Sequence, residues 1–333
     1  MTEKRRTLII GGGSIGERHL RCFQQTGRAD VMLCEINDDL RETLRDRYQL
    51  AQVFGTFEEA LAAKPDIAVI CTPAHLHIPM ARQLAERDIS FLMEKPVSTS
   101  LEGVAELATL IDEKNLLTGV AYVHRSNPLL AGMRDAIRAG RFGKPLQING
   151  ISGQHFPYYR PAYREIYYTK HETGGGAIQD ALTHLLNLGE WFVGPITDVV
   201  ADADHNALEG VEVEDSVNVL ARHSRLMGSY TLNQHQSANE TQVTVICENA
   251  TVRFEGHKGR WSYLTEPETE WQLGEELTFE RDTLFINQAN AFLDCWAQRT
   301  PFVCTLGEGV QTLKVALAIL ESVSDKSWKK ISV

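Results

Sequence analysis

Short hydrophobic runs alternate with longer mixed stretches over the first third of the chain. The stretches between the runs carry apolar residues at helical spacing. Strands that alternate with helices are typical of βαβ units and of a parallel sheet. The predicted strands cover residues 7–11, 30–35, 67–72, 90–94 and 116–122, and the predicted helices begin near Ser14, Asp38, Phe57, His75 and Ser98.

Beyond about residue 145 the hydrophobic pattern changes its period. Three segments alternate between apolar and polar positions, which predicts an antiparallel sheet; they are residues 216–223, 242–248 and 250–256. Helical spacing covers residues 175–194, 283–299 and 306–325. We therefore predict an α/β domain with a doubly wound parallel sheet over residues 1–123. An α+β domain with an open, mainly antiparallel sheet is expected over residues 124–333.

Composition narrows the possible functions. A chain of 333 residues with 43% hydrophobic residues is globular and long enough for about two domains. The net charge of −11 disfavours binding to nucleic acid or to an anionic membrane surface. The chain has neither an apolar run long enough to span a bilayer nor the apolar stretch of an export signal at its start. We therefore expect a cytoplasmic protein.

Neither the cysteines nor the acidic segment indicates disulfide, metal-binding or catalytic chemistry. The six cysteines form no CxxC pair, and Cys34 and Cys71 lie inside apolar runs. We expect reduced, structural thiols and no metal site. The segment from Glu266 to Asp282 holds seven acidic residues and Arg281 as its one base, which predicts a solvated loop or edge.

A glycine-rich turn follows the first predicted strand. Gly11, Gly13 and Gly16 match GxGxxG between the apolar run TLII and the next helix. The first glycine allows a tight turn, the second lets the backbone approach a pyrophosphate, and the third allows close packing of helix against strand. The helix N-terminus, with Ser14 and Ile15, favours negative charge. This context predicts a dinucleotide site in a Rossmann domain.

The end of the second strand supports this prediction. Glu35 follows the glycines by about 20 residues, where a carboxylate can accept hydrogen bonds from the adenosine ribose. Because this carboxylate would repel a 2′-phosphate, we expect NAD as the cofactor. NADP stays open as an alternative, since Arg41 lies near in sequence.

Three later motifs complete a recognisable set: CTPAHLH at 71–77, EKP at 94–96 and GGGAIQDALTH at 174–184. Together with the glycine turn they resemble the Gfo/Idh/MocA family of NAD(P)-dependent oxidoreductases, named after glucose-fructose oxidoreductase, inositol dehydrogenase and a rhizopine catabolism protein. The similarity covers nearly the whole chain. The resemblance implies a dehydrogenase or reductase acting on a secondary hydroxyl of a sugar, sugar derivative or cyclitol. It also implies a homo-oligomer, either a dimer or a tetramer.

The resemblance gives roles to the residues of the first two motifs. Lys95 would reach both the nicotinamide ribose and the reacting hydroxyl, where an ammonium stabilises developing alkoxide charge. The Lys95–Pro96 bond can be cis, as in relatives, although most bonds before proline are trans. The cofactor site would further include Thr72, Pro73, His77 and Glu94, with His77 making local hydrogen bonds.

The third motif contains a candidate acid–base pair. Asp180 and His184 are spaced i, i+4 and share one face of the predicted helix. A carboxylate orients an imidazole and raises its basicity, and imidazole suits proton transfer near neutral pH. We predict that His184 is the general base in alcohol oxidation and the general acid in the reverse direction. Asp180 would orient His184, bind a neighbouring substrate hydroxyl, or do both.

Aromatic and cationic residues concentrate between residues 155 and 171. Five of the nine tyrosines fall between 158 and 168. Rings beside polar donors suit sugars and cyclitols, and the cations favour an anionic group on the substrate. The same residue types are enriched at subunit interfaces, so that alternative stays open. The candidate substrate contacts are Lys95, Arg125, Tyr158, Arg160, Tyr163, Arg164, Asp180 and His184.

Two other functions stay open at this point. One is a glycosidase that keeps NAD bound and uses transient oxidation, and the other is a regulator that binds the nucleotide without catalysis. Retention of Lys95, Asp180 and His184 argues against the regulator. The chain also departs from common family residues around Asp180, with Leu182 two residues and Asn187 seven residues after it, so no relative's substrate can be transferred to it.

Overall fold

The computed structural model describes residues 4–332, which form two compact units. Unit 1 contains the residues up to Ser126 together with Glu280–Gly309, and unit 2 contains Asn127–Phe279 and the chain from Val310 onward. The end of the first segment lies close to the expected domain boundary after residue 123. Residues 280–309 were expected in the C-terminal domain and instead belong to unit 1.

A doubly wound parallel sheet forms the centre of unit 1, as predicted. In the described part of this unit six strands lie in the order β3-β2-β1-β4-β5-β6, the order of a dinucleotide-binding fold. The strands are β1 (Arg5–Ile10), β2 (Ala29–Cys34), β3 (Val53–Phe54), β4 (Ile67–Ile70), β5 (Ser90–Met93) and β6 (Thr118–Val120). Most of their residues are buried, because helices cover both faces of a parallel sheet.

The helices of unit 1 begin close to their expected positions, with one exception. They are α1 (Ser14–Gln25), α2 (Asp38–Tyr48), α3 (Phe57–Ala62), α4 (His77–Glu86), α5 (Val104–Lys114) and α9 (Thr283–Gln298). Helix α5 begins at Val104 and not near Ser98. The hydroxyls of Ser98 and Ser100 each accept a hydrogen bond from the backbone two residues later, and such turns compete with helix formation.

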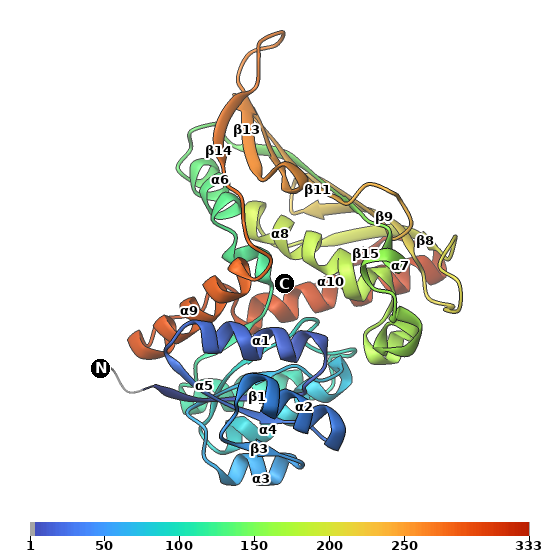
Figure 1. The fold of residues 1–333 in the computed structure, drawn as a ribbon. Helices are drawn as coiled ribbons and strands as arrows, with labels where there is room; N and C mark the ends of the chain where they lie inside the picture. The colour runs from blue at the N-terminus through green and yellow to red at the C-terminus, as the bar shows by residue number, and fades with distance from the viewer. Residues whose placement is uncertain (1–3, 333) are drawn as a thin grey trace. The chain divides into compact units, whose positions relative to one another are not determined.

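Helix α9 joins unit 1 although it lies far away in sequence. Its Phe292 and Leu293 share a core cluster with Leu20 and Phe23 of α1, and the two helices lie side by side in Figure 1. Before α9, Asp282 accepts a hydrogen bond from Nη2 of Arg21 at 2.8 Å. These contacts explain why residues 280–309 belong with the parallel sheet.

Unit 2 is built on a large sheet that is mainly antiparallel, as predicted. Among its described residues nine strands lie in the order β14-β13-β12-β11-β7-β10-β9-β8-β15. Strands β7 and β10 are paired in parallel at the centre of the sheet. The strands are β7 (Pro145–Gly153), β8 (Asp198–Asp204), β9 (Ser216–His223), β10 (Leu226–Asn233), β11 (Glu240–Cys247), β12 (Thr251–Glu255), β13 (Arg260–Leu264), β14 (Gln272–Glu276) and β15 (Lys329–Lys330).

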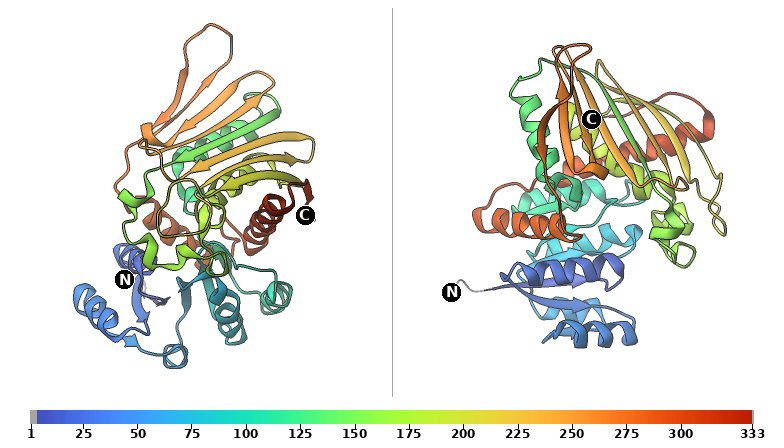
Figure 2. Two further views of the ribbon diagram at one scale, coloured as in Figure 1. Left: turned by 90° about the vertical axis from the view of Figure 1, so that its right-hand side faces the viewer. Right: turned by 45° about the horizontal axis from the view of Figure 1, so that its top comes forward.

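Helices lie against one face of this sheet, as Figure 2 shows. They include α6 (Pro128–Arg138), α8 (Thr183–Val193) and α10 (Leu306–Asp325), and a short helix α7 (Phe156–Tyr159) follows β7. On β9 the residues Val217, Val219 and Ala221 are buried, whereas Asn218 and Leu220 between them are exposed. The alternation therefore separates a covered face of the sheet from an open one.

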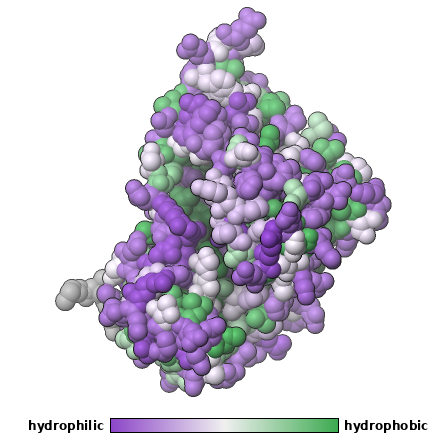
Figure 3. Space-filling view, turned by 45° about the vertical axis from the view of Figure 1, so that its right-hand side comes forward, coloured by the Kyte–Doolittle hydropathy of each residue, from purple (hydrophilic) through white to green (hydrophobic). Residues whose placement is uncertain are grey.

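The surface agrees with the composition. Hydrophilic residues dominate the face shown in Figure 3, with hydrophobic residues scattered among them. The acidic segment begins in the exposed connection between β13 and β14, and β14 is an edge strand, as expected. All six cysteines, which lie among the described residues, are free thiols. Within residues 4–332, the helices are too short or too polar to cross a membrane.

Candidate functional site

The glycine turn between β1 and α1 leaves a helix N-terminus accessible. Gly11 has φ of +94°, and a Cβ at Gly16 would overlap the Gly11 carbonyl oxygen, so both positions require glycine. Gly13 is the N-cap of α1, and a Cβ placed there would meet nothing within 4 Å. The open space lies where unpaired backbone N–H groups favour an anion. This geometry fits the pyrophosphate of a dinucleotide.

Glu35 stands at the end of β2 beside this turn. Its Oε2 accepts a hydrogen bond from the Gly12 amide at 2.6 Å, and its Oε1 accepts one from the Asn37 amide at 2.8 Å. Arg41 donates to the Glu35 carbonyl at 2.9 Å and to Oδ1 of Asp38 at 2.6 Å. The Glu35 carboxylate is therefore fixed at the end of β2 beside the glycine turn. Arg41, the cation considered for a 2′-phosphate, is paired with Asp38.

His77 connects the ends of β4 and β5. Its Nδ1 lies 2.9 Å from the Pro96 carbonyl and its Nε2 lies 2.8 Å from the Thr72 carbonyl. Burial lowers the pKa of His77, although the hydrogen bonds to the Thr72 and Pro96 carbonyls oppose that shift. The residue Pro73 is the N-cap of the short turn that leads into His77. His77 thus holds the TP and KP motifs together.

Lys95 follows β5 and is half-buried, and the Lys95–Pro96 bond is cis. The preceding Glu94 is buried, and its Oε2 accepts a hydrogen bond from the Lys95 amide at 3.0 Å. Its Oε1 lies 2.7 Å from Nε2 of His19, a buried residue of α1 that packs edge-on against Phe285. Sequence reasoning missed His19. The available signal was a histidine on the buried side of the helix that follows the glycine turn.

Asp180 and His184 lie on a helix with an irregular start. Residues Ile178–Leu182 form a π-helical segment that continues into α8, where His184 is the second residue. Such segments occur often at functional sites. Between residues 174 and 189, only Asp180, Ala181 and His184 are less than fully buried. Oδ1 of Asp180 accepts a hydrogen bond from the Tyr167 hydroxyl at 2.7 Å. Two polar side chains thus share the accessible side of an otherwise buried segment.

The tyrosine-rich segment divides into buried and exposed parts. Tyr163 and Tyr168 lie in a small core with Phe156 and the loop at 208–213, whereas Tyr158 is 76% exposed. The Tyr163 hydroxyl and Nε of Arg164 each donate to the Glu209 carbonyl at 2.7 Å. Arg160 is exposed. Of the predicted substrate contacts in this segment, Tyr158, Arg160 and Arg164 are therefore exposed, whereas Tyr163 is buried.

Arg125 is buried and bound within unit 1. Its Nη1 donates to Oε1 of Glu308 at 2.6 Å and to the Val303 carbonyl at 3.0 Å. Burial alone would raise the pKa of Glu308, but the Arg125 guanidinium and the hydrogen bonds from Thr305 together outweigh burial and lower it. This ion pair holds residues 303–308 in unit 1 and favours a structural role for Arg125 over the expected contact with substrate.

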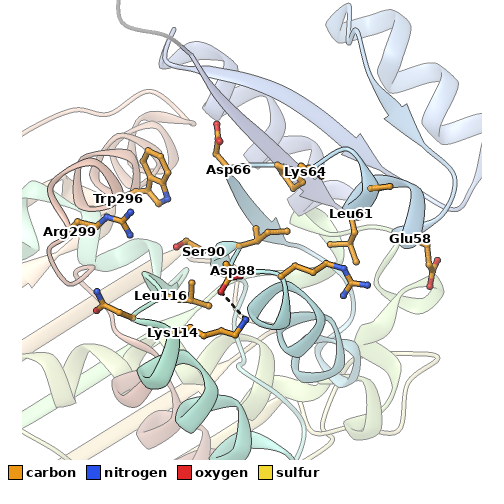
Figure 4. Close-up of a pocket in the computed structure, with 15 residues that line it drawn as sticks. Glu58, Leu61, Lys64, Asp66, Asp88, Ser90, Lys114, Leu116, Trp296 and Arg299 are labelled. Atoms are coloured by element: carbon orange, nitrogen blue, oxygen red, sulfur yellow. Dashed lines mark hydrogen bonds and ion pairs between the residues drawn. The ribbon is translucent and has the colours of Figure 1, made fainter.

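A pocket of about 890 Å³ also lies in unit 1 (Figure 4). Its lining includes Asp66, Ser90 and Leu116, which stand at or just before the starts of β4, β5 and β6. Lys114 and Asp88 form an ion pair at 2.9 Å in its wall. Ligands of doubly wound sheets bind at the carboxyl ends of the strands. This pocket lies at the opposite edge and is not the dinucleotide site.

Comparison with known proteins decides the family. Residues 5–122 match the model of the oxidoreductase family with an NAD-binding Rossmann fold, and residues 130–253 match the GFO/IDH/MocA C-terminal domain. The chain belongs to the Gfo/Idh/MocA family.

Named members of the Gfo/Idh/MocA family include dehydrogenases of sugar derivatives and cyclitols. Levoglucosan dehydrogenase of Pseudarthrobacter phenanthrenivorans is 25% identical over 58% of this chain and 52% of its own length. Inositol 2-dehydrogenase of Acidothermus cellulolyticus is 28% identical over 64% of this chain and 61% of its own length. The chain thus matches between half and two thirds of the length of these relatives.

Solved structures of the family share the whole fold. Levoglucosan dehydrogenase in complex with NADH and levoglucosan superposes with a TM-score of 0.90 at 20% identity, covering 99% of this chain and 100% of that chain. The WlbA dehydrogenase from Bordetella pertussis, in complex with NADH and UDP-GlcNAcA, gives 0.85 at 24% identity, covering 100% and 99%. At these identities the likeness concerns the fold.

For this family member, replacing Glu35 by alanine is expected to weaken NAD binding. Hydrogen bonds to a charged group contribute about 1.5–3 kcal/mol, so the Kd for NAD should rise roughly tenfold or more. Titration calorimetry with NAD and NADP measures the change. Glu42→Ala, which removes an exposed carboxylate paired with Arg45 on α2, is the control. A rise of less than about twofold for Glu35→Ala would exclude the ribose contact.

Proposed function

We propose that the protein is an NAD-dependent dehydrogenase that oxidises a secondary hydroxyl of a sugar, sugar derivative or cyclitol, or reduces the corresponding ketone. One observation carries the proposal: Asp180 and His184 stand on the accessible side of an otherwise buried helix in a chain of this oxidoreductase family. The names of the relatives, levoglucosan dehydrogenase and inositol 2-dehydrogenase, support this class of substrate.

We assign cofactor binding to unit 1. The N-terminus of α1 at Gly13 would hold the pyrophosphate, and Glu35 would accept hydrogen bonds from the adenosine ribose. The ion pair between Arg41 and Asp38 supports NAD over NADP, because it occupies the cation that a 2′-phosphate would need. Bound NAD supplies the hydride acceptor for the oxidation.

We assign proton transfer to His184 of unit 2. In the oxidation direction its imidazole takes the proton of the substrate hydroxyl, and in the reduction direction it returns that proton. Asp180 orients the imidazole or accepts a hydrogen bond from a neighbouring substrate hydroxyl. Lys95 of unit 1 places an ammonium at the reacting oxygen and stabilises its negative charge as hydride leaves.

Substrate recognition is assigned to the exposed part of the tyrosine-rich segment. Tyr158 offers a ring face for stacking, and Arg160 offers a guanidinium for a carboxylate or phosphate. Tyr163 and Arg164 are weaker candidates, since both already bind the Glu209 carbonyl. An anionic sugar derivative is therefore part of the proposal.

Free thiols at all six cysteines, each among the described residues, support a reducing compartment such as the cytoplasm.

The open face of the sheet in unit 2 supports self-association into a dimer or tetramer. Leu220, Met227 and Ile151 are all exposed there, on the neighbouring strands β9, β10 and β7. Leu220→Arg is expected to lower the mass measured by light scattering, because a buried, unpaired charge opposes association. The control is Leu101→Arg, since Leu101 is also exposed, at 46%, and belongs to unit 1. A monomeric wild type would contradict self-association.

A substrate screen tests the proposed activity. Sugars, sugar acids and inositols are mixed with the protein and NAD or NADP, and reduced cofactor is followed by its absorbance. The proposal predicts turnover with at least one polyhydroxylated compound and a preference for NAD. Tight NAD binding without any turnover would favour the regulator, and cleavage of glycosides without net reduced cofactor would favour the glycosidase.

A further inference from the structure

The helix that carries Asp180 begins against a buried carboxylate that the proposed reaction does not use. Glu214, just before β9, is only 8% exposed. Its Oε1 accepts a hydrogen bond from the Ile178 amide at 2.8 Å, and its backbone carbonyl accepts one from the Ala177 amide at 2.9 Å. Glu214 thus accepts hydrogen bonds from two consecutive backbone N–H groups of the first helical turn. Such N–H groups have no partner within the helix. It also places negative charge at the helix N-terminus, where such charge is stabilising.

The glycines before this helix are shaped around the same carboxylate. Gly176 has φ of +86°, and a Cβ built on it would lie 2.6 Å from Oε1 of Glu214. A Cβ at Gly175 would overlap the Tyr168 carbonyl oxygen. The backbone therefore approaches Glu214 more closely than any residue with a side chain would allow. This explains the glycine run better than a general need for flexibility.

His171 completes the arrangement from the other side. Its Nε2 lies 2.6 Å from Oε2 of Glu214, so both carboxylate oxygens have a partner. That hydrogen bond raises the pKa of His171, against the opposing effect of burial, and the nearby Glu172 adds to the rise. A buried carboxylate is costly unless it is paired and hydrogen-bonded, and His171 supplies the pairing. A hydrogen bond from the Gly175 amide to the Lys170 carbonyl at 2.8 Å further fixes the backbone between His171 and the start of the helix.

We propose that Glu214 is a positioning residue that fixes the Gly174–Gly176 turn and, through it, the π-helical segment with Asp180 and the first turn of α8 with His184. The proposal rests on the proposed function, because positioning matters for turnover only if those two side chains act on the substrate. A displacement of about 1 Å at a reacting group can cost roughly 100-fold in rate. Glu214 therefore controls kcat without touching the substrate.

Three variants of the full-length protein test this role. Glu214→Ala removes both side-chain contacts, and kcat is expected to fall roughly 100-fold while the KM for NAD stays within about twofold. Glu214→Gln keeps an acceptor for the Ile178 amide and should recover a large part of the loss. The matched control is Glu255→Gln: Glu255 is 7% exposed and, at the end of β12 in the same unit, pairs with Arg260 and Lys258. The control should keep the wild-type kcat.

Hydrogen exchange supplies a readout that does not depend on turnover. Amides of the segment 174–186 should exchange faster in Glu214→Ala than in wild type, and at the wild-type rate in Glu255→Gln. If Glu214→Ala fails to fold, Glu214→Asp replaces it, because the shorter side chain withdraws the carboxylate from the Ile178 amide. A Glu214→Asp protein with the same kcat and the same exchange as Glu255→Gln would overturn the proposal. If the wild type turns over no substrate, the proposed function fails, and the exchange of segment 174–186 still decides the role of Glu214.

Discussion

Replacing His184 by alanine is expected to lower kcat by at least ~100-fold, the usual scale for removing an acid–base group. The reason is that the substrate hydroxyl loses the imidazole that takes its proton as hydride departs. NAD binding should be unchanged, because the glycine turn and Glu35 belong to unit 1. Steady-state kinetics on the substrate found in the screen, together with NAD titration, measure both quantities.

The control for this variant is His257→Ala. His257 is an exposed histidine of the same unit, in the turn after β12, and its removal should leave kcat unchanged. A His184→Ala protein with wild-type kcat would contradict the assignment of the acid–base group. Equal losses in both variants would indicate a general effect of removing a histidine and would likewise contradict it.

Replacing Lys95 by alanine is expected to give the second large loss, again at least ~100-fold in kcat/KM. The ammonium stabilises charge that develops on the reacting oxygen, and a methyl group offers no substitute. Lys95→Arg keeps the charge but spreads it over a planar group with a different reach, so it should restore activity only in part. Lys114→Ala is the control, since Lys114 pairs with Asp88 at the opposite edge of the sheet.

Together these two variants test whether Lys95 and His184 act in catalysis. If Lys95→Ala and His184→Ala both turned over the substrate at the wild-type rate, the catalytic assignment would be wrong. A loss in one variant alone would leave the other residue with a binding or structural role. Circular dichroism and thermal unfolding of each variant exclude misfolding as the cause of a loss.

The parallel sheet and the glycine turn could be predicted because both depend on local sequence. Apolar runs of strand length, a glycine at each position that needs one, and an acidic residue at the end of β2 all lie within a short stretch. The place of α9 could not be predicted in this way. Its periodicity predicts a helix with one apolar face, but not that this face packs against Leu20 and Phe23 of α1.

For the site, too, the residues marked by local motifs could be predicted, whereas contacts between distant segments could not. Motifs indicated Lys95, Asp180 and His184. The helix that carries Asp180 and His184, however, begins against the carboxylate of Glu214, which accepts a hydrogen bond from the Ile178 amide 36 residues earlier in the sequence. His19 and Glu94 likewise meet only through the fold. Arg125 illustrates the reverse case. Sequence analysis made Arg125 a candidate substrate contact, and its ion pair with Glu308 could not be predicted because the two residues lie 183 positions apart.

The most direct test of the central claim follows the hydride itself. A substrate from the screen is prepared with deuterium on the carbon that bears the reacting hydroxyl, and the products are analysed by mass spectrometry after incubation with NAD. The account predicts one ketone and one deuterium-labelled reduced cofactor for each turnover. Consumption of the substrate without labelled reduced cofactor, or with the label kept in a cleaved sugar, would contradict it.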